Sequence, residues 1–136
     1  MLIFSVGEAP IHKGLSMHEL SIAKSILEIV QGSLSSNDES SVESIRVRVG
    51  QLCGVIPDSL EFSFIALTTD TPLQSARLEI DVVPFTLECK TCGEVFANDI
   101  GFVICPHCGG SDTTILTGTE LKVVEIELRE HPEEVV

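Results

Sequence analysis

Basic residues are scarce in this chain of 136 residues, in which 8 lysines and arginines stand against 21 aspartates and glutamates. The formal net charge is -13. Contacts with nucleic-acid phosphates need clustered Lys and Arg, so this balance argues against bare nucleic acid as a partner. It also argues against binding to an anionic membrane surface. The charge favours a protein that meets metal cations or a basic partner.

Long hydrophobic runs are also missing. A membrane-spanning helix needs about 18 or more consecutive apolar residues, and no such run is present. The first residues, MLIFSVGEAPIHKGLS, lack the basic start of a signal peptide, and Glu8 and Pro10 interrupt their short apolar run. We therefore expect a cytoplasmic protein, in which five cysteines are more often metal ligands than disulfide partners.

Sequence signatures of catalysis are absent too. The chain has no G-x-x-x-x-G-K-[ST] segment, which excludes a P-loop GTPase. No nucleophile–base pair and no pair of catalytic carboxylates stands out. We therefore predict a binding protein and not an enzyme. Cys53 has no activating base nearby in the sequence, and we interpret it as a small buried hydrophobic side chain.

The spacing of apolar residues predicts an α+β (α/β-like) fold in which a three-stranded sheet packs with two helices. Helical spacing covers residues 20–34 and resumes from Pro57 until Thr71-Pro72 ends the helix. Alternation of apolar and polar residues predicts strands over 44–49, 77–83 and 120–128.

The same pattern divides the chain into segments. The α/β domain comprises 17–84 and 119–130, and a small domain, 85–118, is inserted between its last two strands. Residues 1–16 form an N-terminal extension, interpreted as a disordered arm or an over-called start, and 131–136 form a loose acidic tail. The insert is too poor in large apolar residues to build its own core, so it needs a metal or another cross-link.

That insert contains four of the five cysteines in the pattern C-x2-C-x12-C-x2-C, as Cys89, Cys92, Cys105 and Cys108. Two cysteines separated by two residues let a tight turn direct both thiolates at one ion, at about 2.3 Å. Gly93 and Gly109 follow the two pairs and suit the backbone of such turns. Four thiolates select zinc, with iron as the main rival. The pattern therefore predicts a closed, structural, zinc-ribbon-like site.

A second candidate site is the stretch Ser16-Met17-His18-Glu19 at the start of the first helix. S-x-x-E is a capping box, in which Ser16 caps the helix and Glu19 reaches back to the Ser16 amide. The alternative is a metal site. The first amides of a helix have no intrahelical acceptor, and Ni(II) or Cu(II) can displace amide protons and bind the nitrogens in a square plane, with the His18 imidazole in chelate range.

The short motifs of this chain occur in a specific order: MHEL at a helix start, V-R-V-G-x-L, P-D-S-L-E-F-x-F, then CxxCG and CPxCG. In this combination, from residue 17 to about 128, the chain resembles the hydrogenase-maturation nickel chaperones of the HypA/HybF family. The resemblance implies delivery of Ni(II), as transient cargo, to the large subunit of [NiFe]-hydrogenases together with a HypB-type nickel GTPase. It also implies service to urease maturation in some members, and either a monomer or a homodimer.

The resemblance also assigns site residues. It implies a structural zinc on the four clustered cysteines. It implies nickel on Met17, His18 and Glu19, with Met17 and Glu19 acting mainly through backbone nitrogen. A further acidic ligand falls on Asp58, with Glu61 as its competitor. The family's MHE is N-terminal and here it is internal, so the Met17 nitrogen is an amide if residues 1–16 are present and an amine if they are not.

Two other classes share the cysteine pattern. A zinc-ribbon adaptor would bind a protein partner through its knuckles without delivering nickel. An iron redox protein of the rubredoxin type would use the same four thiolates and would be red, whereas the zinc protein is colourless.

Overall fold

The computed structural model describes residues 2–11 and 19–129. The chain divides into two compact units. Unit 1 comprises Met1–Val47, Ile56–Ile80 and Lys122–Val136, and unit 2 comprises Arg48–Val55 and Asp81–Leu121. Unit 2 contains the whole predicted insert, 85–118, and extends beyond it at both ends. It also includes residues 48–55, which the sequence analysis had placed in the α/β domain.

Helix α1, Glu19–Ser33, buries one face in unit 1. Its buried residues recur at helical spacing and are Ile22, Ala23, Ile26 and Val30. At its end the Ser33 hydroxyl donates a hydrogen bond to the Ile29 carbonyl at 2.7 Å. A short 3-10 helix, Ser36–Ser41, follows.

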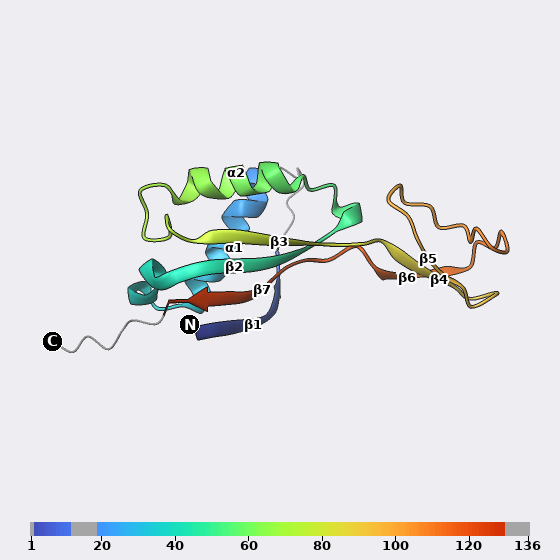
Figure 1. Cartoon of the computed structure of the whole chain (residues 1–136), viewed down its shortest axis with the longest axis horizontal. Coiled ribbons are helices and arrows are strands. Elements are labelled where there is room, and N and C mark those ends of the chain that lie inside the picture. Colours follow the sequence, from blue (N-terminus) through green and yellow to red (C-terminus); the bar gives the residue numbers. More distant parts are fainter. Residues whose placement is uncertain (1, 12–18, 130–136) are drawn as a thin grey trace. The chain divides into compact units, whose positions relative to one another are not determined.

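Helix α2, Pro57–Thr68, begins with proline in its first turn, as predicted. Leu60, Phe64 and Thr68 form its buried face, and the Thr68 hydroxyl donates to the Phe64 carbonyl at 2.9 Å. Helices α1 and α2 pack against each other within unit 1. Figure 1 shows α2 running alongside strand β3 (Arg77–Val83), which is an edge strand of the main sheet.

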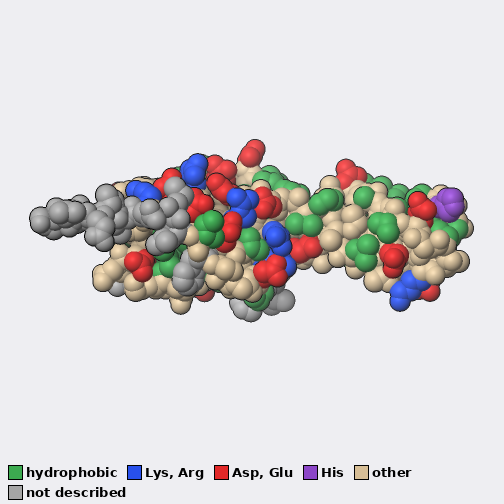
Figure 2. Space-filling model, turned by 60° about the horizontal axis from the view of Figure 1, so that its bottom comes forward, with side chains coloured by type: hydrophobic (Ala, Val, Ile, Leu, Met, Phe, Trp, Pro, Cys, Tyr) green, Lys and Arg blue, Asp and Glu red, His purple; other side chains and the backbone are tan. Residues whose placement is uncertain are grey.

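The main sheet has four strands in the order β1-β7-β2-β3, where three were predicted. Strand β2, Val42–Gly50, and strand β7, Leu121–Leu128, lie in the middle. Ile45, Val47 and Val49 of β2 are buried, whereas Arg46 points to the other face. There Arg46 forms ion pairs with Glu79 at 3.1 Å and Glu125 at 3.0 Å. Figure 2 shows basic and acidic side chains side by side over this part of the molecule.

The additional strand is β1, Leu2–Pro10, so the expectation of a disordered arm is wrong for these residues. It pairs antiparallel with β7, from Leu2 opposite Leu128 to Pro10 opposite Lys122. The register shifts between Ser5 and Ala9, where Gly7 and Glu8 have φ of 64° and 57°. Glu8 and Pro10, which seemed to interrupt the segment, therefore occupy a bulge and a strand end on an edge strand, where both are tolerated.

Unit 2 contains a sheet of three short strands in the order β5-β4-β6. They are β4, Thr86–Cys89, β5, Val95–Ala97, and β6, Thr113–Thr117. Phe85 and Leu87 are fully buried. The Gln51 side chain accepts a hydrogen bond from the Phe85 amide at 3.1 Å, which explains why residues 48–55 belong to this unit.

No helix in the described ranges 2–11 and 19–129 is long and apolar enough to cross a membrane.

Candidate metal centres

The two cysteine pairs lie on turns with the same backbone hydrogen bonds. In the first, the Gly93 amide donates to the Cys89 carbonyl and the Cys89 amide donates to the Glu94 carbonyl, both at 2.8 Å. In the second, the Gly109 amide donates to the Cys105 carbonyl at 2.8 Å, and the Cys105 amide donates to the Gly110 carbonyl at 2.9 Å. Gly93 and Gly109 have φ of 79° and 75°, as the sequence pattern required of these turns.

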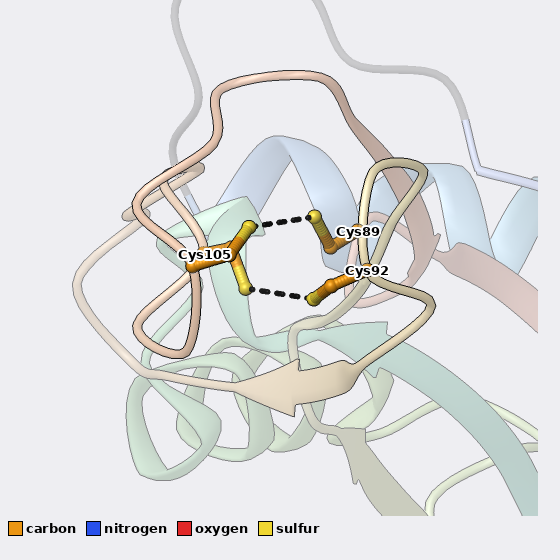
Figure 3. A group of neighbouring side chains, drawn as sticks. Cys89, Cys92 and Cys105 are labelled. Atoms are coloured by element: carbon orange, nitrogen blue, oxygen red, sulfur yellow. Dashed lines mark hydrogen bonds between the residues drawn. The ribbon is translucent and has the colours of Figure 1, made fainter.

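The turns bring all four sulfurs of Cys89, Cys92, Cys105 and Cys108 within 4.8 Å of one another. The sulfurs of Cys89 and Cys108 lie 3.6 Å apart, and so do those of Cys92 and Cys105. Figure 3 shows Cys89 and Cys92 directed toward the facing turn, which carries Cys105. A zinc ion with four sulfurs at about 2.3 Å places them about 3.8 Å apart, so the four thiols fit a tetrahedral zinc.

The environment of the sulfurs also suits a bound cation. Cys89 and Cys105 are buried, while Cys92 and Cys108 are exposed. The amides of Cys92 and Thr91 lower the pKa of the Cys89 thiol to about 6, against the opposing effect of burial. The Glu94 amide lowers the pKa of Cys92, but burial and the neighbouring thiols outweigh it and raise that pKa to about 12. One thiol is thus readily ionised, and the divalent ion itself stabilises the remaining thiolates.

Four protein ligands leave no open position, so this centre is structural. It is the one group of at least three potential metal ligands among the described residues. His107 is exposed and does not belong to the group.

Cys53 is buried and separate from this centre. Its thiol donates to the Glu120 carbonyl at 3.2 Å, within unit 2. This agrees with its interpretation as a small buried side chain.

The second candidate centre is described in part. Met17 and His18 lie outside the described residues. Glu19 is the first residue of α1, and its Oε2 accepts a hydrogen bond from the Ile56 amide at 3.2 Å. Since Ile56 immediately precedes α2, this bond brings the starts of the two helices together. Asp58 lies exposed in the first turn of α2, and Glu61 lies exposed one turn further on.

The sequence pattern did not identify Asn98 as a structural residue. The side chain of Asn98 binds its own loop: Oδ1 accepts from the amides of Ile100 at 3.2 Å and Phe102 at 2.9 Å, and Nδ2 donates to the Phe102 carbonyl at 2.9 Å. Asparagine side chains often form such local turns. The Asn98-Asp99 pair between two strands was therefore the sequence feature that could have revealed this residue.

The chain combines an α+β unit with a second, small unit that carries a closed four-thiolate centre, and this combination is typical of small zinc-containing proteins. Comparison with known protein families identifies which family of such proteins it belongs to. The family described as "Hydrogenase/urease nickel incorporation, metallochaperone, hypA" matches residues 17–128. The chain therefore belongs to the HypA family, a family of metallochaperones.

Similar proteins agree with this assignment. The hydrogenase maturation factor HypA of Desulfosudis oleivorans is 43% identical over 115 residues, which cover 84% of this chain and 100% of the relative. That of Geobacter metallireducens is 41% identical over 112 residues, covering 82% and 99%. The solution structure of the Ni metallochaperone HypA from Helicobacter pylori has a TM-score of 0.57 at 23% identity, with 85% of this chain and 100% of that chain covered. This last likeness concerns the fold.

Proposed function

We propose that this protein binds Ni(II) at Met17, His18 and Glu19 and delivers it to the large subunit of an [NiFe]-hydrogenase. Membership of a family described by nickel incorporation supports this function. The absence of a phosphate-binding loop from the sequence makes a separate nucleotide-hydrolysing partner necessary if delivery is driven by GTP. A HypB-type GTPase is the partner we propose, and urease maturation proteins are further proposed partners.

The position of Glu19 carries the nickel assignment. As the first residue of α1, it has a backbone nitrogen that lacks an intrahelical partner. Its carboxylate is already engaged by the Ile56 amide. One carboxylate oxygen, Oε2, is engaged in this way, and we propose the backbone nitrogen of Glu19 as the group that binds the metal. Together with the His18 imidazole and neighbouring amide nitrogens, this gives the nitrogen-rich set that Ni(II) takes in square-planar geometry.

Asp58 is the better candidate for an additional carboxylate ligand. It lies two residues after Ile56, whose amide contacts the Glu19 side chain. Glu61 lies a further turn along α2 and lines a cavity beside the segment 74–79, to which Asp58 does not contribute. We therefore assign the additional ligand to Asp58.

A Ni(II) titration followed by isothermal calorimetry tests the site. It compares the full chain, the chain beginning at Met17, and His18→Ala, each loaded with zinc. We expect His18→Ala to lose most of its nickel affinity and to keep its zinc. Equal nickel affinity in the full chain and in His18→Ala would contradict the proposal.

A matched pair of variants tests the additional ligand. Asp58→Asn should weaken nickel binding, whereas Glu61→Gln should leave it unchanged. The reverse order would transfer the role to Glu61.

A further inference from the structure

The outer face of α2 carries two large exposed apolar side chains. Phe62 and Ile65, one turn apart on α2, are 73% and 54% exposed. On α1 the exposed surface presents Lys24, Glu28 and Gln31 to solvent, with Leu20 as its one large exposed apolar side chain. A helix that lies on the surface of a protein usually has one apolar face, and a helix with apolar residues on both faces is usually covered on both. The outer face of α2 therefore resembles a surface that a partner covers.

This face borders a groove. A cavity of about 430 Å³ lies between α2 and the segment 74–79, which leads into strand β3. Glu61 and Ile65 of α2 and Ala76 and Leu78 of the segment are among its lining residues. A shallower hollow of about 270 Å³ adjoins it, lined by Asp58, Glu61, Phe62 and Ile65. The two share Glu61 and Ile65, and we call them together the α2 groove.

The charges along the α2 groove are unbalanced. Arg77 lies within 3.8 Å of both Glu43 and Glu79, so its charge is already compensated. Glu79 also pairs with Arg46. Among the described residues, Asp58 and Glu61 have no such ion pair, which leaves two carboxylates beside Phe62 and Ile65. A complementary partner presents a large apolar side chain next to lysine or arginine.

We propose that the α2 groove docks a segment of a partner protein that carries large apolar side chains flanked by lysine or arginine. The larger cavity has room for an aliphatic or aromatic side chain, and the two carboxylates meet the basic groups. A second copy of this chain is a poor occupant, because each copy brings a net charge of -13 and only 8 basic residues. Since Asp58 is also the carboxylate proposed for nickel, the docking is proposed for the nickel-free protein, in which both carboxylates are available to the basic groups.

The test uses the full chain loaded with zinc and kept free of nickel. The probe is a synthetic amphipathic peptide of leucine and lysine at helical spacing, titrated into the ¹⁵N-labelled protein and followed by NMR. Matched peptides replace lysine with glutamate, or leucine with serine. We expect amide shifts concentrated in 56–68 and 74–79, weaker binding at higher salt, and no binding of either matched peptide.

Substitutions inside and outside the α2 groove then test whether the probe peptide binds there. Phe62→Ser and Glu61→Lys should each weaken binding of the probe by at least about tenfold. Leu116→Ser changes an exposed apolar residue of unit 2, and Glu28→Lys changes an exposed acid of α1, so both should bind as the unmodified chain does. Because Phe62 is largely exposed, its variant should fold, which its zinc content and NMR spectrum verify.

Three results would overturn the proposal. The first is that the probe does not bind, and the second is equal loss of affinity in the control variants. The third is a homodimer of the full chain that Phe62→Ser converts to a monomer, which would make the groove a contact between copies.

Discussion

At Gly118 the structure leaves no room for a side chain. The φ of this residue is 112°, and an added Cβ would lie 2.5 Å from the Cα of Phe85. We predict that Gly118→Ala lowers the free energy of unfolding by about 2–4 kcal/mol, because alanine adds both a steric clash and backbone strain. Urea denaturation of the zinc-loaded protein, followed by far-UV circular dichroism, measures this loss.

Gly32→Ala is the matched control. Gly32 lies in α1, and nothing stands within 4 Å of its added Cβ. Alanine there should leave the stability unchanged or raise it by up to about 1 kcal/mol. Equal stability of the two variants would contradict the account of Gly118. The sequence revealed Gly93 and Gly109 through the CxxCG pattern, but it gave no sign of Gly118, because the contact that requires glycine joins residues 33 positions apart.

Cys92, a zinc ligand, and Cys53, which lies apart from the metal centre, form a second matched pair of positions to substitute. Cys92→Ser removes one of four thiolates, so we predict loss of zinc and faster amide exchange throughout Asp81–Leu121. Cys53→Ser should retain one equivalent of zinc, since the serine hydroxyl can still donate to the Glu120 carbonyl. Metal analysis and hydrogen exchange measure both effects. Zinc retained in full by Cys92→Ser would show that the ion is bound elsewhere.

At the scale of elements, local sequence predicted most of the fold. The strand predicted at 77–83 is β3, Arg77–Val83, and the helix predicted from Pro57 is α2. These elements follow from periodicity, which needs no knowledge of distant residues. Strand β1 was missed because its partner is β7, more than a hundred residues away, and because a bulge disrupts its alternation.

Removal of β1 should therefore affect β7 before any other element. We predict that deletion of residues 1–16 speeds amide exchange in β7 by at least about tenfold, because it opens the β7 edge and removes the buried side chain of Ile11. Glu8→Gln breaks the 3.2 Å ion pair with Lys122 and is the mild control, with a loss of at most about 1 kcal/mol. Unchanged exchange in β7 after the deletion would show that β1 contributes no protection.

At the scale of the whole molecule, the sequence located the inserted unit but not its full extent. The cysteine spacing marked residues 85–118 as a segment of its own. Residues 48–55 join it through the hydrogen bond from the Phe85 amide to Gln51 and through backbone bonds from Gly50 to Glu120 and from Leu52 to Gly118. Such pairings between distant segments leave no periodic trace in the sequence, so a reading of local pattern assigned 48–55 to the wrong unit.

The two units differ in how they are stabilised. Of the twelve largest fully buried side chains among the described residues, Phe85 and Leu87 alone belong to unit 2. Unit 1 therefore has an apolar core of its own, formed by residues such as Ile22, Ile45 and Phe64. We therefore expect unit 2, which has little apolar burial, to depend on its four thiolates and the ion they fit.

Zinc removal should consequently unfold the molecule in part. We predict that a chelator at neutral pH, under reducing conditions, abolishes amide protection in β4, β5 and β6 while α1 and α2 keep theirs. Hydrogen exchange read by mass spectrometry separates these elements, and added zinc should restore the lost protection. The helices are the internal control, because they belong to unit 1 and pack against each other there. Loss of protection in α1 and α2 at the same rate as in β4 would mean that the two units unfold as one cooperative body.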